Sequence, residues 1–418
     1  MFRYRSLRVL LLAAILPIFC APAQGSHGRL NARQLTSAAS AIARTKTGID
    51  VLEQQNFAPL RGKRVGLITN QTGVDSRGRR TVDVLAHASG FQLALLFSPE
   101  HGFGGRANTT VADSTDAATG LPIYSLYGGV RRPTEAMLAS INALVFDVQD
   151  AGVRFYTYIT TLAYCMEAAA AHDIPIFVLD RPNPLGGDVI EGPTLDPGRI
   201  SFTGYFPMPV RYAMTIGEFA QMFNAENAVG ADLHVIAMQG WRRGDTYDQT
   251  GLVWVAPSPN LRSVDAALLY PGMEILQAGG ISVGRGTDAP FEFLGAPWIR
   301  AHEFLAELDR RKIPGVSFTP TRFTPNEDPY EGQICEGVTI DITDRGALGS
   351  MRMGLEIADV LRRMYPTYFR LPSTITLLGS QSTIDSLVHG ESPAAIVAGW
   401  SGDLDKFRQM REKYLLYH

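Results

Sequence analysis

The sequence is poor in cysteine, in long apolar runs and in positive charge. Only three of its 418 residues are cysteines, and they form no Cys-x-x-Cys pair or His/Cys cluster, which argues against a zinc site. The apolar run Val9–Phe19 is shorter than the roughly 20 residues that a membrane span needs. Lysine and arginine form no basic stripe, so we do not expect a nucleic-acid-binding protein.

Glycine-rich nucleotide-binding motifs are also missing. The first predicted strand is followed by Asn70-Gln71-Thr72-Gly73, not by Gly-x-Gly-x-x-Gly, and there is no Walker A sequence. Without those glycines the backbone cannot approach a pyrophosphate closely. A dinucleotide is therefore not expected even if the sheet is Rossmann-like, and the sequence predicts no cofactor.

The N-terminus has the pattern of an export signal. Three arginines precede the apolar run, and Ala21-Pro22-Ala23 follows it as a cleavage site, which predicts a signal peptide over residues 1–23. A polar leader, residues 24–45, comes next. Lipid attachment at Cys20 is the competing interpretation, which bulky Phe19 disfavours. Removal of the signal leaves 35 basic and 41 acidic residues, a formal charge of −6. We expect an exported protein, periplasmic or secreted, with Cys165 and Cys335 as unpaired thiols.

Short apolar strands alternate with helices over the first half of the chain. This alternation indicates an α/β fold, with a parallel sheet that is covered on both faces. We therefore predict a Rossmann-like domain over residues 46–200 and a smaller, mixed α/β domain over residues 201–418. The predicted strands of the first domain are Arg64–Thr69, Phe91–Phe97, Ala143–Val148 and Ile174–Leu179.

Polar side chains follow each of these four strands. Ligands of such sheets bind beyond the carboxyl ends of the strands, where the four segments meet. We therefore expect one polar pocket, with Asn260 and Arg285 from the second half as further candidates. The candidates after the four strands are Asn70 and Gln71; Glu100 and His101; Asp150, Arg154, Tyr156 and Tyr158; and Asp180, Arg181, Asn183 and Glu191.

The second of these segments is the centre of the predicted site. Glu100 and His101 lie between Pro99 and a glycine-rich turn, so a carboxyl and an imidazole stand side by side at the mouth of a buried strand. They form a candidate proton-transfer pair if burial raises the pKa of the acid. The long segment from Glu100 to Pro133 shows little periodicity, and we interpret it as a lid over the pocket.

Several other features of the sequence allow both a structural and a functional interpretation. Asp147, inside a strand, is a buried structural acid or a functional one, and Asp180 with Arg181 is an ion pair or part of the site. Tyr156 and Tyr158 share one side of an extended segment, which suits stacking on a sugar ring as well as a core. Gly280-Ile281-Ser282-Val283-Gly284 matches the nucleophile elbow, but it lacks the strand before the serine that this motif needs.

Several motifs together resemble one family. GLITNQTG, FSPEHGFGG, DVQDAGVRFYTY, DRPNPLGG with the following EGP, PSPN and the terminal REKYLLY are similar to the exo-β-N-acetylmuramidases of the NamZ type, long catalogued as a bacterial domain of unknown function. The resemblance extends from about Gly48 to His418. It implies a glycoside hydrolase that removes N-acetylmuramic acid from the non-reducing end of peptidoglycan fragments, with a C-terminal domain that closes the cleft.

The resemblance also implies roles for residues. Glu100 corresponds to the glutamate of the SPEHG motif and is expected to be the catalytic acid/base. The second catalytic carboxylate would be Asp150 or Asp180, unless the acetamido group of the substrate attacks instead. The lactyl carboxylate of muramic acid calls for a bidentate cation, for which Arg154, Arg181 and Arg285 are candidates in that order.

Two other function classes compete with this one. A periplasmic muropeptide- or sugar-binding protein would share the α/β cleft and the tyrosines but would not need Glu100 as an acid. An esterase would use Ser282. Neither the oligomeric state nor the stereochemical outcome of hydrolysis is predicted.

Overall fold

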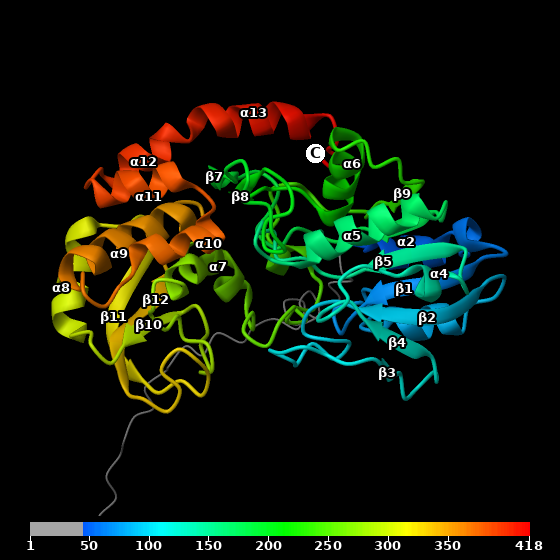
Figure 1. Ribbon diagram of the computed structural model, residues 1–418, viewed down its shortest axis with the longest axis horizontal. Helices are drawn as coiled ribbons and strands as arrows, with labels where there is room; N and C mark the ends of the chain where they lie inside the picture. The colour runs from blue at the N-terminus through cyan, green and yellow to red at the C-terminus, as the bar shows by residue number, and fades with distance from the viewer. Residues whose placement is uncertain (1–44) are drawn as a thin grey trace, which may run out of the picture. The chain divides into compact units, whose positions relative to one another are not determined.

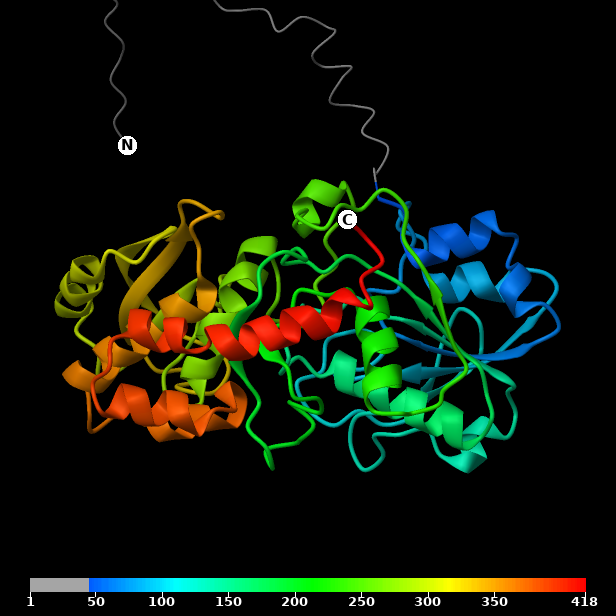
Figure 2. The ribbon, with the colours of Figure 1, turned by 90° about the horizontal axis from the view of Figure 1, so that it is seen from above.

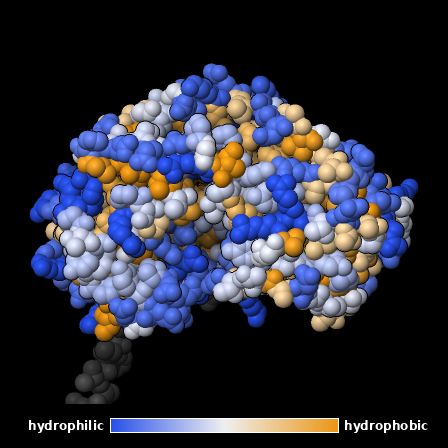
Figure 3. All heavy atoms as spheres, viewed as in Figure 1, coloured by the Kyte–Doolittle hydropathy of each residue, from blue (hydrophilic) through white to orange (hydrophobic). Residues whose placement is uncertain are grey.

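The computed structural model describes residues 45–418 (Figure 1). The predicted signal peptide, Cys20 and leader residues 24–44 lie outside the described residues. None of the helices within residues 45–418 combines the length and the apolar character that a membrane crossing requires. The face seen in Figure 3 is mostly hydrophilic, with apolar residues in separate groups. Cys165 and Cys335 are buried and unpaired, as predicted.

A seven-stranded sheet forms the first part of the fold, and six of its strands are parallel. Its strand order is β3-β4-β2-β1-β5-β6-β9, in which only β3 is antiparallel to its neighbour. The sheet order changes direction at β1, so the loops after β1 and β5 diverge there, which is where ligands of such sheets bind. The strands are β1 Arg64–Thr69, β2 Gln92–Ser98, β3 Ser114–Thr115, β4 Pro122–Ser125, β5 Ala143–Asp147, β6 Ile176–Leu179 and β9 Leu233–Ile236.

Both faces of this sheet are covered by helices, which explains its apolar strands. Along β5, Ala143 and Val145 face the core beneath α2 (Gly48–Gln54) and α3 (Thr81–Ala86), whereas Leu144 and Phe146 face α5 (Tyr158–Ala171) and α6 (Ile216–Glu226). Successive strand residues point to opposite faces, so a strand that is covered twice must be apolar throughout. The predicted parallel sheet is confirmed.

Two parts of the sheet were not foreseen. The segment interpreted as a lid contains β3 and β4, and β4 pairs with β2, so part of that segment belongs to the sheet. The far edge strand β9 comes from beyond residue 200 and pairs with β6. The predicted boundary after residue 200 therefore does not coincide with the end of the sheet, and the division into domains stays a prediction.

A smaller antiparallel sheet lies in the second part of the chain, as the mixed α/β prediction implies. Its order is β10-β12-β11, with β10 Phe293–Ala296, β11 Val316–Phe323 and β12 Cys335–Ile342. The helices of this part are α7 Val264–Gln277, α8 Ala301–Arg311 and α9 Ser350–Met364, followed by α10 Ile375–Leu378, α11 Gln381–Val388, α12 Pro393–Gly399 and α13 Ser401–Glu412. The remaining elements are α4 Glu135–Leu138, the hairpin of β7 Glu191–Thr194 and β8 Pro209–Arg211, and the 3₁₀ turns Ala58–Leu60, Tyr247–Thr250 and Leu371–Thr374.

Helix α7 matters for the site because it carries two of the cavity residues. It crosses α9 at two glycines, Gly272 and Gly354, and a Cβ on Gly272 would lie 1.9 Å from the carbonyl oxygen of Ser350. Two helices can approach this closely only where side chains are absent. The crossing thus sets the position of α7 against the rest of the second part.

The C-terminal segment connects the two parts of the chain. After α13 the chain reaches α6, where the Tyr414 hydroxyl donates to Glu226 at 2.7 Å and the Leu416 amide donates to Glu218 at 2.8 Å (Figures 1 and 2). The Tyr417 hydroxyl then donates to Asp180 at 2.6 Å, beneath the carboxyl end of β6. The last residues therefore stabilise the region from which the fourth polar loop starts.

Candidate active site

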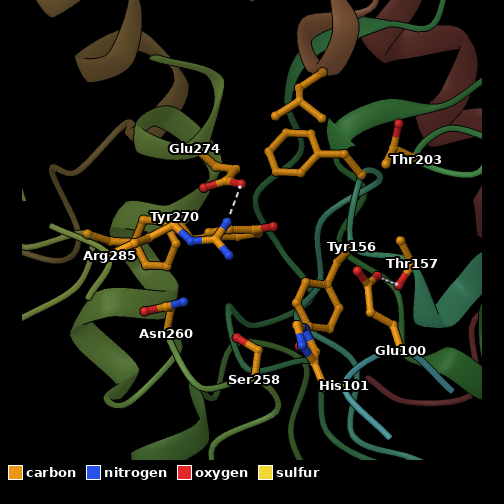
Figure 4. A pocket seen from close by; sticks show the side chains of 13 residues that line it. Glu100, His101, Tyr156, Thr157, Thr203, Ser258, Asn260, Tyr270, Glu274 and Arg285 are labelled. Atoms are coloured by element: carbon orange, nitrogen blue, oxygen red, sulfur yellow. Dashed lines mark hydrogen bonds and ion pairs between the residues drawn. The ribbon is translucent and has the colours of Figure 1, made fainter. Parts of the chain in front are cut away.

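A cavity of about 140 Å³ lies where the second and third polar loops meet α7 (Figure 4). Glu100 and His101 reach it from the end of β2, Tyr156 and Thr157 from the start of α5, and Arg285 from the loop before β10. The other lining residues are Phe155, Thr203, Ser258, Asn260, Tyr270, Glu274, Phe291 and Leu377. The cavity thus joins both parts of the chain, with polar groups on opposite walls.

Glu100 is oriented by the helix that follows the third loop. The Thr157 hydroxyl, in the N-cap residue of α5, donates a hydrogen bond to the Glu100 carboxylate (Figure 4). Tyr127 also contacts Glu100, and burial first and this contact second raise the pKa of its phenol to about 12. Tyr127 is therefore protonated at neutral pH and can act as a second hydrogen-bond donor to Glu100.

His101 is held in one tautomer by the glycine-rich turn. Its Nδ1 lies 2.7 Å from the carbonyl oxygen of Ala107, which can only accept, so Nδ1 carries the proton and Nε2 is free to accept. The backbone of His101 has φ of +69°, a left-handed conformation that is unusual for histidine. Burial lowers the pKa of the imidazole, so His101 is neutral at neutral pH.

Glu274 and Arg285 form an ion pair on the opposite wall. Arg285 Nη1 lies 3.4 Å from Glu274 Oε1, and Arg285 Nε lies 4.0 Å from Glu327 Oε2. Burial raises the pKa of Glu274 to about 7, and the charge of Arg285 opposes that rise. This carboxyl therefore titrates close to neutral pH, which is rare for a glutamate.

Asn70, Gln71 and Tyr158 support the site without lining this cavity. Gln71 Nε2 donates to the Ala256 carbonyl at 2.8 Å, and the Tyr158 hydroxyl donates to the Pro257 carbonyl at 2.7 Å. Asn70 Nδ2 in turn donates to the Tyr158 hydroxyl at 2.9 Å. These bonds hold the segment that brings Ser258 and Asn260 to the cavity.

Asp150 and Asn183 are also predicted site residues that lie behind the cavity. Asp150 is buried, and its carboxylate accepts from the Gly152 amide at 2.6 Å and from the Tyr212 hydroxyl. Burial raises the pKa of Asp150 to about 6. Asn183 donates to the Met214 carbonyl at 2.8 Å, so both side chains are engaged in shaping the third and fourth loops.

Arg154, the first candidate for binding the substrate carboxylate, is fully buried. Its guanidinium donates to four backbone carbonyls at 2.7–2.9 Å, and burial lowers its pKa to about 9. Arg154 thus connects the hairpin of β7 and β8 to α10. Its guanidinium does not line the cavity. The acceptors are the carbonyls of Pro193, Met208, Leu377 and Leu378.

Asp180 and Arg181 also have structural partners. Arg181 pairs with Asp147 through two hydrogen bonds of 2.6 and 2.9 Å, and both side chains are buried. Asp180 accepts from the Thr215 hydroxyl at 2.7 Å as well as from Tyr417, and burial raises its pKa to about 6. The ion pair considered between Asp180 and Arg181 is not formed, because Arg181 pairs with Asp147 instead. All three side chains nevertheless have structural partners, which favours structural roles for them.

Glu191 and Ser282 lie away from the cavity as well. Glu191 is 3.3 Å from Arg211 and lines a different cavity, of about 550 Å³. Ser282 is buried and accepts from the Gly284 amide at 3.3 Å, and its backbone bridges to Gly295 instead of turning between a strand and a helix. The esterase interpretation thus has no exposed nucleophile.

The structure brings five of the predicted residues to the cavity, namely Glu100, His101, Tyr156, Asn260 and Arg285. The sequence interpretation missed Tyr270 and Glu274, which are four residues apart on α7 and so point to one side of the helix. A signal did exist, because Glu274 is an isolated acid between Met273 and Ile275 in an otherwise apolar stretch.

Comparison with known proteins identifies the family. The N-terminal model of exo-beta-N-acetylmuramidase NamZ matches residues 65–265, and the C-terminal model matches residues 268–417. The chain belongs to the NamZ family. The peptidoglycan beta-N-acetylmuramidase NamZ of Bacillus subtilis (strain 168) is 42% identical over 379 residues, which cover 90% of this chain and 92% of that protein. The family resemblance predicted from the motifs is confirmed.

Two crystal structures from Bacteroides fragilis share the fold of this chain. Both are described as DUF1343 family proteins, with TM-scores of 0.83 and 0.74 and identities of 38% and 30%. Each match covers 90% of this chain, and it covers 100% and 99% of the two crystallised chains. At these identities and lengths, the NamZ fold extends over nearly all of the described residues.

Proposed function

We propose that this protein is a glycoside hydrolase that releases N-acetylmuramic acid from the non-reducing end of peptidoglycan fragments. One observation supports this above all: Glu100, in the segment that carries the family resemblance, reaches a small cavity in which Thr157 orients it. A carboxyl placed in this way can transfer a proton to the oxygen between two sugars. The activity named for the Bacillus subtilis relative agrees with this proposal.

In the reaction, Glu100 gives its proton to the glycosidic oxygen while the bond from that oxygen to the anomeric carbon breaks. Water then adds to the anomeric carbon, and Glu100 takes back a proton from it. The products are free N-acetylmuramic acid and a glycan shortened by one sugar. Tyr156 lines the cavity with an aromatic ring, which suits contact with the face of a sugar.

The second catalytic role is best assigned to the substrate. Asp150 and Asp180 lie outside the cavity, and Glu274 is engaged with Arg285. The acetamido oxygen of N-acetylmuramic acid can attack its own anomeric carbon while the protonated glycosidic oxygen leaves, as in substrate-assisted hydrolases. Water then attacks that carbon and breaks the bond to the acetamido oxygen, which restores the acetamido group. Arg285 then remains, of the three arginines considered, as the cation for the lactyl carboxylate, because it is the one that lines the cavity.

The rest of the glycan has a second space beside this cavity. A cavity of about 600 Å³ also has His101 among its lining residues, together with Asn70, Gln71 and Phe103. We assign it to the leaving group, since His101 faces both spaces. Export through the signal peptide at residues 1–23 belongs to the same proposal, because peptidoglycan lies outside the cytoplasm.

A chromogenic β-N-acetylmuramide tests the proposal. We expect cleavage by the unsubstituted protein and by Ser282→Ala, and a loss of about 10²–10⁴-fold in kcat for Glu100→Gln, the range for removal of a general acid. Binding of the sugar without turnover in all three proteins would indicate a sugar-binding protein instead. Activity lost in Ser282→Ala but retained in Glu100→Gln would indicate an esterase-like site.

A further inference from the structure

Arg285 has most of its hydrogen-bonding capacity unused. Among the described residues its guanidinium makes one hydrogen bond, the 3.4 Å contact from Nη1 to Glu274 Oε1, although arginine offers five N–H donors. Its side chain is 25% exposed at the cavity. A carboxylate that enters the cavity can therefore bind the guanidinium through two oxygens, and it would compete with Glu274 for this cation.

Glu274 is poorly supported as an anion once Arg285 is shared. Its side chain is 13% exposed, and its second oxygen, Oε2, is buried without a hydrogen-bond partner among the described residues. A buried carboxylate that loses its counter-ion is strongly disfavoured, whereas the neutral acid is not. Burial already raises the pKa of Glu274 to about 7 with Arg285 in place.

The charges around Glu274 point the same way. His101 is neutral, because burial lowers its pKa, and Tyr270 is neutral, because burial raises its pKa well above 10. Arg285 is thus the cation that faces three carboxyls before any ligand enters. These carboxyls belong to Glu274, Glu327 and Glu100. The groups that face Glu274 or its partner are Arg285, Glu100, Glu327, His101, Tyr127 and Tyr270.

We propose that Arg285 passes from Glu274 to the carboxylate of the substrate, and that Glu274 binds a proton when this happens. Glu274 is thereby a specificity-determining residue, because the exchange requires an anionic group that N-acetylglucosamine lacks. This inference rests on the proposed function, since it takes the lactyl carboxylate as the incoming anion. Glu274 acts here through Arg285 and does not take part in bond breaking.

The exchange has a defined pH dependence. Below about pH 6 Glu274 already holds its proton, so a carboxylate ligand binds without further proton uptake. Above about pH 7 the free protein has lost this proton and must take it up again on binding, so affinity falls by up to about tenfold per pH unit. His101 is also neutral in the free protein, because burial lowers its pKa, so the Glu274→Gln variant is needed to assign the proton to Glu274.

Titration calorimetry in buffers of different ionisation enthalpy measures how many protons the protein takes up when the ligand binds. In the Glu100→Gln background, which removes turnover, we expect N-acetylmuramic acid to bind at pH 8 with uptake of more than about half a proton, and at pH 5.5 with almost none. Added Glu274→Gln should abolish the uptake and make the affinity independent of pH. Added Asp265→Asn, which removes a carboxyl of the same helix that pairs with Arg345 outside the cavity, is the matched control and should retain both effects.

Other results would overturn the inference. These are uptake that persists in Glu274→Gln, equal uptake with N-acetylglucosamine, or no binding of N-acetylmuramic acid. A Glu274→Gln protein with normal Glu100 whose kcat falls while KM and its pH dependence stay unchanged would place Glu274 in the chemistry instead. If Glu274→Gln does not fold, the comparison of the two sugars in the Glu100→Gln protein decides. Failure of the proposed function would appear separately, as no cleavage of the chromogenic muramide by the unsubstituted protein.

Discussion

Replacement of Gly272 by alanine should destabilise the protein, although glycine to alanine usually stabilises a helix. In a helix interior alanine is better than glycine by about 0.5–1 kcal/mol. Here the new Cβ would lie 1.9 Å from the Ser350 carbonyl oxygen and 3.1 Å from the Gly354 amide nitrogen, both backbone atoms that cannot rotate away. Forcing the helices apart costs about 1–3 kcal/mol or more, so the net effect is a loss.

Urea unfolding shows directly whether Gly272→Ala raises or lowers the free energy of unfolding. Gly402→Ala is the matched control, because Gly402 is in α13 and a Cβ there meets nothing within 4 Å, so this variant should be neutral or slightly stabilised. Gly272→Ala should unfold at lower urea and also lose activity, since α7 carries Tyr270 and Glu274. Equal or higher stability of Gly272→Ala would refute the close crossing of α7 and α9.

Two further predictions concern residues behind the cavity. Arg154→Ala should cost more than about 3 kcal/mol in the free energy of unfolding, because four backbone carbonyls lose their donor and three of these bonds are buried; urea unfolding that matches the unsubstituted protein would contradict this role. Asp150 has a raised pKa of about 6, so the folded protein binds its proton more tightly than the unfolded chain, and stability from this group increases as pH falls from about 6 to 4. Unfolding curves of Asp150→Asn should lack this gain, worth roughly 3 kcal/mol, whereas an identical pH dependence would exclude Asp150 as its source.

The layout of the large sheet could be predicted from local pattern. Strands such as Arg64–Thr69 are buried at every position after the first, and only a parallel sheet with two covers buries both faces. The capping box of Thr215 and Glu218 at the start of α6 is equally local, because four consecutive residues carry its signature. What the pattern did not reveal was β4, because a four-residue strand with proline and two polar residues has no apolar period and forms only against β2.

Among the site residues, the sequence alone determined that the second and third polar loops lie together, because the carboxyl ends of parallel strands share one edge of the sheet. It did not determine which polar side chain at that edge is free. Arg154 and Arg285 are the same residue type in similar polar loops, yet the first donates to four backbone carbonyls and the second to one carboxylate in the cavity. Such partners come from segments up to 224 residues away, and only the tertiary structure decides which donors they occupy.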